Sequence, residues 1–245
     1  MFSAKVKAEV LKNVIEAASP LVNEIKLNIK PDGISFRAVD SAHVAMIDLN
    51  LSSKAFEEYK ADEMELGIDL DKLNGVLRLA SSNDIVSLEY DEETHRLVVR
   101  IGNLVRKMGL IDTAGMPDPK VPNLNLPSKV ILKSNELNQG IKASQAISDH
   151  IALSVDADGF ELYAEGDTDV VNLRLPKDLL SELNAPQKCK SLFSIDYFSS
   201  MIKPVKSDEE VTIFLGNDNP IKLEFDFADK NGHVTYLLAP RIESE

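Results

Sequence analysis

The sequence has one cysteine, no long apolar segment and no surplus of positive charge, and each shortage excludes a class of protein. The single Cys189 excludes an internal disulfide framework and fits a reducing compartment. No apolar run approaches the roughly 18 residues of a membrane span, so we expect no membrane partner. The first five residues carry no apolar signal segment, and we expect no export.

The charge balance is acidic. The chain has 245 residues, with 27 basic and 40 acidic side chains and a formal net charge of −13. As a bulk property, this charge argues against a protein that coats nucleic acid or anionic membrane. The length fits two domains of about 120 residues or one larger domain.

The inventory of catalytic motifs is equally thin. The sequence lacks the usual phosphate-binding, metalloprotease and nucleophile-elbow motifs, and its four histidines lack metal-ligand spacing. The segment 156–159 resembles the start of a calcium loop but lacks the later ligands, so a hairpin turn is the better interpretation. Cys189 lies far in sequence from any histidine and is interpreted as a surface or half-buried residue without a role. We therefore expect no metal, no cofactor and no enzymatic activity.

An internal repeat organises the chain. A shift of 126 residues aligns 11–49 with 137–175 without a gap, and identical pairs include Asp32/Asp158 and Gly33/Gly159. The segment 82–90 matches 207–215 at a shift of 125. The apolar pairs keep their phase through helix, turn and strand patterns, which indicates two copies of one domain.

Each copy has the pattern of an α+β domain, with two helices on a large antiparallel sheet. Apolar spacing predicts helices over 8–18, 70–80, 134–147 and 196–206. Alternating segments separated by turns, such as 25–29 and 34–38, predict the strands.

A proline-rich segment joins the copies. Four prolines fall within eleven residues of 112–129, which excludes a helix or a central strand and predicts an extended connector. We expect an N-terminal domain at 1–115, a connector at 116–128 and a C-terminal domain at 129–245. The connector carries Val121, Leu124 and Leu126, and the end of the chain is also apolar at 237–240. From the residues alone, these two segments either pack on each other or form the walls of a groove.

The predicted helices differ in charge from the rest of the chain. Four of their five acidic residues fall in the first turn, where they complement the helix dipole. Past that turn the polar faces hold mainly Lys and Arg. This asymmetry favours a mildly basic helical surface for weak, sequence-independent contact with DNA phosphates over an ordinary solvated face. The basic residues are Lys12, Lys72, Arg78, Lys142, Lys203 and Lys206.

Several segments resemble a known family. The C-terminal segment Tyr236–Glu243, with the sequence YLLAPRIE, resembles the terminal signature of proliferating cell nuclear antigen, the sliding clamp of DNA replication. The segment 37–44 resembles that family's central loop, and the segments 32–34 and 67–70 also fit. The resemblance covers the full chain and is greatest to archaeal members.

The resemblance implies a DNA-clamp fold in a homotrimeric, pseudo-sixfold ring, with helices around double-stranded DNA and sheets outside. The six basic residues above would then face DNA without reading bases. The implied partners are DNA polymerase, clamp loader, ligase and flap nuclease, bound through short peptide motifs, and the implied location is the cytoplasm, in association with the nucleoid. An archaeal clamp can also be a heterotrimer.

The resemblance also implies two sets of contact residues. In a partner-peptide pocket on the front face, the loop at 39–44 and Pro220 would complete the wall formed by the connector and the chain end. The pocket set is Val39, His43, Val44, Val121, Leu124, Leu126, Pro220, Leu237, Leu238, Ala239 and Pro240. The subunit interface would pair two strand edges, with the set Val105, Lys107, Gly109, Ile111, Val171, Leu173 and Leu175.

Three positions depart from the family's pattern. Gly75 stands where many relatives carry lysine, Glu16 is acidic on a helix that should face DNA, and Leu237 stands where many eukaryotic members have tyrosine. Two other functions stay open: a checkpoint-type heterotrimeric clamp subunit, and a duplicated α+β enzyme or ligand-binding protein.

Overall fold

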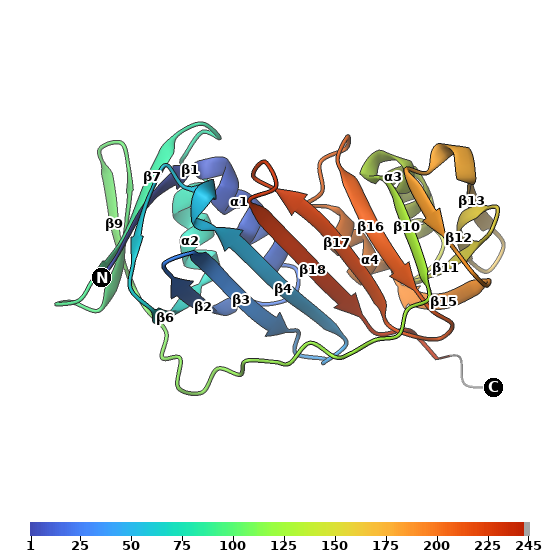
Figure 1. The fold of residues 1–245 in the computed structure, drawn as a ribbon, viewed down its shortest axis with the longest axis horizontal. Helices are drawn as coiled ribbons and strands as arrows, with labels where there is room; N and C mark the ends of the chain where they lie inside the picture. The colour runs from blue at the N-terminus through green and yellow to red at the C-terminus, as the bar shows by residue number, and fades with distance from the viewer. Residues whose placement is uncertain (243–245) are drawn as a thin grey trace. The chain divides into compact units, whose positions relative to one another are not determined.

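The computed structural model describes residues 1–242, which divide into two compact units (Figure 1). Glu243, the last residue of the YLLAPRIE segment, lies outside the described residues. Unit 1 comprises residues 1–41, 47–120 and 226–234; unit 2 comprises residues 42–46, 121–225 and the described residues from 235 onward.

The chain passes through one series of elements twice, as the repeat predicts. The first series is β1 Phe2–Lys7, α1 Ala8–Ala18, β2 Glu24–Lys30, β3 Gly33–Val39, β4 Ala45–Ser52, a 3₁₀ turn Ser53–Ala55, β5 Glu58–Ala61, β6 Met64–Asp69, α2 Leu70–Leu77, β7 Ile85–Asp91, β8 Arg96–Ile101 and β9 Leu104–Gly109. The second is β10 Ser128–Lys133, α3 Ser134–Gln145, β11 His150–Asp156, β12 Gly159–Glu165, β13 Val170–Pro176, a 3₁₀ turn Lys177–Leu179, β14 Glu182–Asn184, β15 Cys189–Ser194, α4 Ile195–Ile202, β16 Glu210–Leu215, β17 Ile221–Phe227 and β18 Gly232–Leu238.

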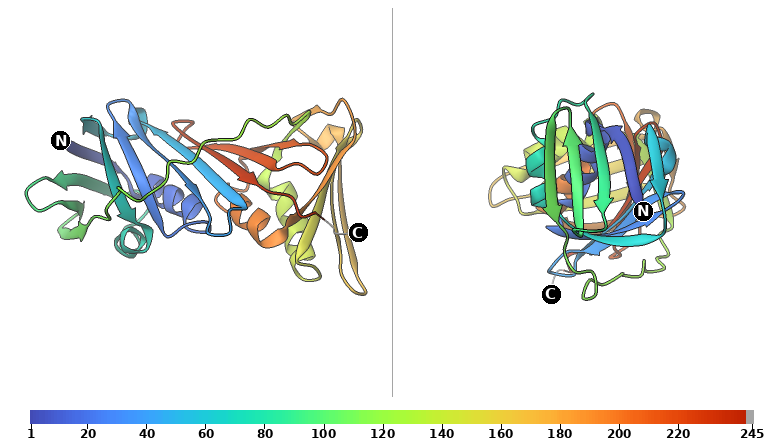
Figure 2. Two further views of the ribbon diagram at one scale, coloured as in Figure 1. Left: turned by 90° about the horizontal axis from the view of Figure 1, so that it is seen from below. Right: turned by 90° about the vertical axis from the view of Figure 1, so that its left-hand side faces the viewer.

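The strands of each unit belong to two antiparallel sheets, which refines the expected single sheet. Unit 1 has a five-stranded sheet in the order β5-β1-β7-β8-β9, which faces the viewer in the right-hand view of Figure 2, and a row β6-β2-β3-β4. Unit 2 has a four-stranded sheet, β13-β12-β11-β15, and a row β14-β10-β16-β17-β18. Consequently β9 and β13 are edge strands.

The same steric constraint requires glycine at both equivalent positions of the repeat. A Cβ atom at Gly33 would collide with the carbonyl oxygen of Leu51, and one at Gly159 with the carbonyl oxygen of Leu175. Gly33 also has a φ of 151°, a conformation that other residues rarely adopt. Both hairpins, β2–β3 and β11–β12, therefore need glycine where a neighbouring strand passes close to the turn.

The helices begin with equivalent main-chain contacts in the two copies. The N–H groups of Ala8 and Ser134, at the starts of α1 and α3, donate to the carbonyls of Asp84 and Glu209 over 2.8 and 2.9 Å. These bonds satisfy donors that a helix cannot satisfy internally. Their acceptors lie at equivalent positions of the matching segments 82–90 and 207–215. α1 packs against α2, and α3 against α4.

Three of the four predicted helices are shorter than expected. α2 ends at Leu77 because the next turn closes through i to i+3 bonds, and α3 ends at Gln145 in the same way. α4 ends at Ile202, since Pro204 cannot continue it. Arg78 and Lys203 are therefore C-caps, and Lys206 lies in the following turn.

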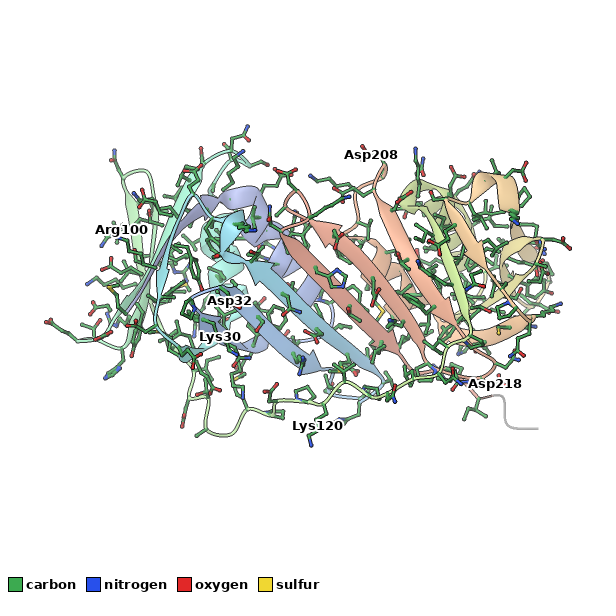
Figure 3. All side chains as sticks on the ribbon, viewed as in Figure 1. Lys30, Asp32, Arg100, Lys120, Asp208 and Asp218 are labelled. Carbon is green, nitrogen blue, oxygen red and sulfur yellow. The ribbon has the colours of Figure 1, made fainter. Side chains whose placement is uncertain are left out.

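Acidic side chains gather in turns outside the helices. Asp208 and Asp218 lie at opposite ends of β16, and Asp32 lies in the β2–β3 turn beside Lys30 (Figure 3). Each helix keeps one acidic residue in its first turn, as predicted.

Candidate DNA-facing and peptide-binding sites

The three predicted DNA-facing side chains of unit 1 differ in their exposure. Lys72 and Arg78 are exposed, and Lys72 forms a 3.0 Å ion pair with Asp69, the N-cap of α2. Lys12 is half-buried, and its ammonium group donates a 2.6 Å hydrogen bond to the carbonyl of Ala80, in the turn after α2. Lys12 thus joins α1 to the end of α2, a structural contact that the sequence did not indicate.

The three predicted DNA-facing side chains of unit 2 are all exposed. Lys142 lies in the last turn of α3, Lys203 caps α4, and Lys206 lies just beyond it. Cations at helix C-termini are favoured by the helix dipole. These positions leave the charges accessible to a polyanion without cost to the helices.

Gly75, where many relatives carry lysine, lies next to a cation from another element. The guanidinium of Arg106, an exposed residue of β9, lies 3.4 Å from the place that a Cβ atom of Gly75 would occupy. Reasoning from the sequence missed Arg106, because only the topology brings β9 next to α2. Glu16, the other departure, is exposed on α1.

A groove of about 350 Å³ lies within unit 2, between the connector and the outer face of β16–β18. Four of the predicted pocket residues line it: Val121, Leu124, Leu126 and Leu237. Leu237 faces outward from β18 yet is only 7% exposed, and Val121 is 42% exposed. The connector and the chain end therefore form the walls of an open groove and do not simply bury one another.

Four further residues line the groove and were not predicted: Pro122, Asn123, Phe214 and Lys222. Phe214 and Lys222 are directly opposite on β16 and β17, and the ammonium of Lys222 lies 3.8 Å from the centre of the Phe214 ring. Their alternation with buried neighbours marks them as outward-facing, but not as groove residues.

The remaining predicted pocket residues do not line the groove. Leu238 is buried in the core, and the N–H of Ala239 donates to the carbonyl of Val44 over 2.8 Å. His43 has a positive φ of 58° and is exposed, while Pro220 and Pro240 are half-buried. These six belong to unit 2 but not to the lining of the groove; Val39 ends β3 in unit 1.

The predicted interface residues lie at two edge strands. Val105, Lys107 and Gly109 lie on β9, and Val171, Leu173 and Leu175 on β13. Leu175 is buried within unit 2. Ile111 follows β9, and its N–H already donates to the carbonyl of Gly67 over 2.9 Å, so this donor is not available to a second chain.

Other candidate sites are sparse. Within residues 1–242, no group of three His, Cys, Asp or Glu side chains has the geometry to hold a metal ion. The segment 156–159 forms a hairpin turn, as predicted, and the Asp156 carboxylate accepts hydrogen bonds from the main chain and from Arg174. The expectation of a surface or half-buried Cys189 was wrong: the side chain is fully buried in β15 and accepts a 3.4 Å hydrogen bond from Ser128. No helix in the described part of the chain is long and apolar enough to cross a membrane.

Comparison with known proteins covers both units. The model of the N-terminal domain of proliferating cell nuclear antigen matches residues 1–108, and that of its C-terminal domain matches residues 120–241. Proteins named DNA polymerase sliding clamp from Methanosarcina barkeri and Methanosarcina mazei are 44% and 45% identical over 100% of both chains.

Solved structures of proliferating cell nuclear antigen have the same fold as this chain. A structure of A. fulgidus PCNA with the C-terminal region of FEN-1 bound has a TM-score of 0.95 and 34% identity, with 100% of each chain covered. PCNA from Thermococcus kodakaraensis has a TM-score of 0.92 and 28% identity, with 98% of this chain and 100% of that chain covered. The repeat, the duplicated fold and these matches together show that the chain belongs to the proliferating cell nuclear antigen family, the DNA polymerase sliding clamps.

Proposed function

We propose that this protein is a DNA sliding clamp, which encircles duplex DNA and tethers replication and repair enzymes. The full-length similarity to proteins named DNA polymerase sliding clamp carries the proposal. The clamp increases processivity by holding a partner close to DNA, so we expect no catalytic turnover of its own.

Contact with DNA would be electrostatic and independent of sequence. The exposed cations at and after the helices would contact phosphates, and Lys12 would add its charge while it holds Ala80. Few contacts suffice for a clamp, since a closed ring holds DNA by topology and must still slide. The acidic turns elsewhere would keep DNA from other surfaces.

The groove of unit 2 would bind short segments of partner enzymes: polymerase, clamp loader, ligase and flap nuclease. The structure of A. fulgidus PCNA with the C-terminal region of FEN-1 supports a peptide mode of binding in this family. An apolar groove with few polar groups is suited to anchor residues that carry most of the binding energy.

The ring would close through the two edge strands. An edge strand presents unpaired main-chain groups, and pairing β9 of one chain with β13 of the next is a head-to-tail contact that must close to avoid a filament. Three chains of two domains would make the pseudo-sixfold ring.

The solution mass of the purified chain tests this assembly. At micromolar concentration, sedimentation should give three times the chain mass of 27.0 kDa. Proline at Asn172, whose N–H points away from β12, should remove ladder hydrogen bonds between chains and release monomers that keep the unfolding transition of unit 1. A wild-type mass of 27.0 kDa at every concentration would contradict a homotrimer, and a trimeric proline variant would place the interface elsewhere.

A further inference from the structure

Lys222 is the charged residue among those that line the groove. Its ammonium group lies over the Phe214 ring and also forms a 3.0 Å ion pair with Glu224, two residues along β17. The two side chains are 29% and 25% exposed, so the pair lies at the protein surface and remains open to solvent. Glu224 is not part of the groove lining. A segment in the groove would therefore contact the cation directly.

The rest of the lining is uncharged. The connector contributes Val121, Leu124 and Leu126, and β18 contributes Leu237. An apolar partner segment would exclude water from these side chains and from part of the ammonium. Charge interactions strengthen as water is excluded, so this single cation would act on the partner more strongly than a lysine in open solvent.

We propose that Lys222 is a specificity-determining residue, which favours partner segments that carry a carboxylate next to their apolar anchors. The inference rests on the proposed function, because it assumes that the groove binds peptide. An ammonium group has three donors. Glu224 takes one of them and the Phe214 ring faces another part of the group, which leaves donors for a partner's Asp or Glu.

The same geometry disfavours basic segments. A Lys or Arg at that place would be repelled by Lys222 at close range, while Glu224 lies outside the lining. Specificity of this kind combines an attractive and a repulsive element. The Glu224 carboxylate competes with a partner's carboxylate for the ammonium, so its removal should strengthen acidic segments.

Isothermal titration with a peptide series tests the proposal. The probe is the C-terminal peptide of FEN-1, in versions with Glu, Gln or Lys placed at each position in turn, titrated into the full-length protein. At one position or more, the Glu version should bind about fivefold or more tightly than the Lys version at low salt. In Lys222→Met, which keeps the apolar stem, this ratio should fall below about twofold. In Glu224→Gln, affinity for the Glu version should rise.

The outcomes separate the two proposals. A ratio that persists in Lys222→Met, or the absence of any charge preference at every position, would overturn the role of Lys222 while peptide binding stands. If the parent peptide does not bind, or binds Leu126→Asp as tightly as the wild type, the groove is not the peptide site and both proposals fail. Melting temperatures within a few degrees of wild type, measured on each variant, show that the fold is kept.

Discussion

The ammonium group of Lys12 on α1 donates a hydrogen bond to the carbonyl of Ala80, beyond the end of α2. This bond gives a residue predicted to face DNA a second role, since it caps the turn that ends α2. A half-buried charged donor removed from its acceptor costs about 1–2 kcal/mol.

Lys12→Ala should therefore lower the free energy of unfolding by about 1–2 kcal/mol, measured by urea denaturation. Lys142→Ala is the matched control, because Lys142 is exposed in the last turn of α3 and should cost at most about 0.5 kcal/mol. Equal losses in the two variants would show that the bond to Ala80 contributes nothing specific.

The exposed cations should determine the salt dependence of DNA binding. Replacing Lys72, Arg78, Lys142, Lys203 and Lys206 by alanine should leave the oligomeric mass unchanged and weaken binding to duplex DNA. Each lost phosphate contact should reduce the slope of log affinity against log salt by about 0.9. An unchanged slope would place these residues away from DNA.

Adding a cation at Gly75 tests the same surface, because it should increase the salt dependence of DNA binding. Its missing Cβ has 3.4 Å to the Arg106 guanidinium, and glycine inside a helix costs about 0.5–1 kcal/mol relative to alanine. Gly75→Lys should raise both the stability and the salt slope, the slope by about 0.9. Gly75→Ala should raise the stability alone. If the lysine variant behaves as the alanine variant does, this part of α2 does not face DNA.

Asp69 makes the stability of α2 depend on pH. Hydrogen bonds from the Lys72 N–H and then from the Lys72 ammonium hold the pKa of Asp69 below its ordinary value of 3.8. The stabilisation is therefore present above pH 3.8 and is lost as the pH falls through the lower folded-state pKa. Asp69→Ala should cost about 1 kcal/mol at pH 7, and its deficit should shrink as the medium is acidified below pH 3.8. Asp71→Ala, which keeps the cap, should cost less; equal costs at pH 7 would contradict a capping role.

Leu126 lines the groove, so a charged substitution there should disrupt peptide binding directly. Leu126→Asp should weaken a bound partner peptide by about 2 kcal/mol, because few anchors carry the binding energy. The control Asn125→Asp adds the same charge at an exposed neighbour and should change affinity less than about twofold. Truncation before Leu238 should instead lower the melting temperature, since it removes a core side chain and the Ala239–Val44 bond. Titration of both point variants decides whether Leu126 contacts the peptide.

Features that depend on periodicity and on the internal repeat could be predicted from the sequence. The paired glycines 33 and 159, the buried face of α2 and the proline-rich connector are all local patterns with one physical cause each. Helix ends were less predictable, since α2 stops through main-chain geometry and not at a glycine or proline. Lys222, Phe214 and Arg106 could not be found, because the groove and the contact with α2 arise only when segments distant in sequence pack together: the connector near β16 and β17, and β9 beside α2. The burial of Cys189 follows from its phase on β15, which its polar neighbours obscure.

The central claim is that the protein holds DNA by encircling it. After loading by a clamp loader onto nicked circular duplex DNA, the protein should remain bound when salt is raised enough to break phosphate contacts. Cutting the same circle with a restriction enzyme should release it from the free ends within the dissociation assay. Equal retention on circular and cut DNA, or release from both at the same salt, would contradict encirclement and leave only ordinary electrostatic binding.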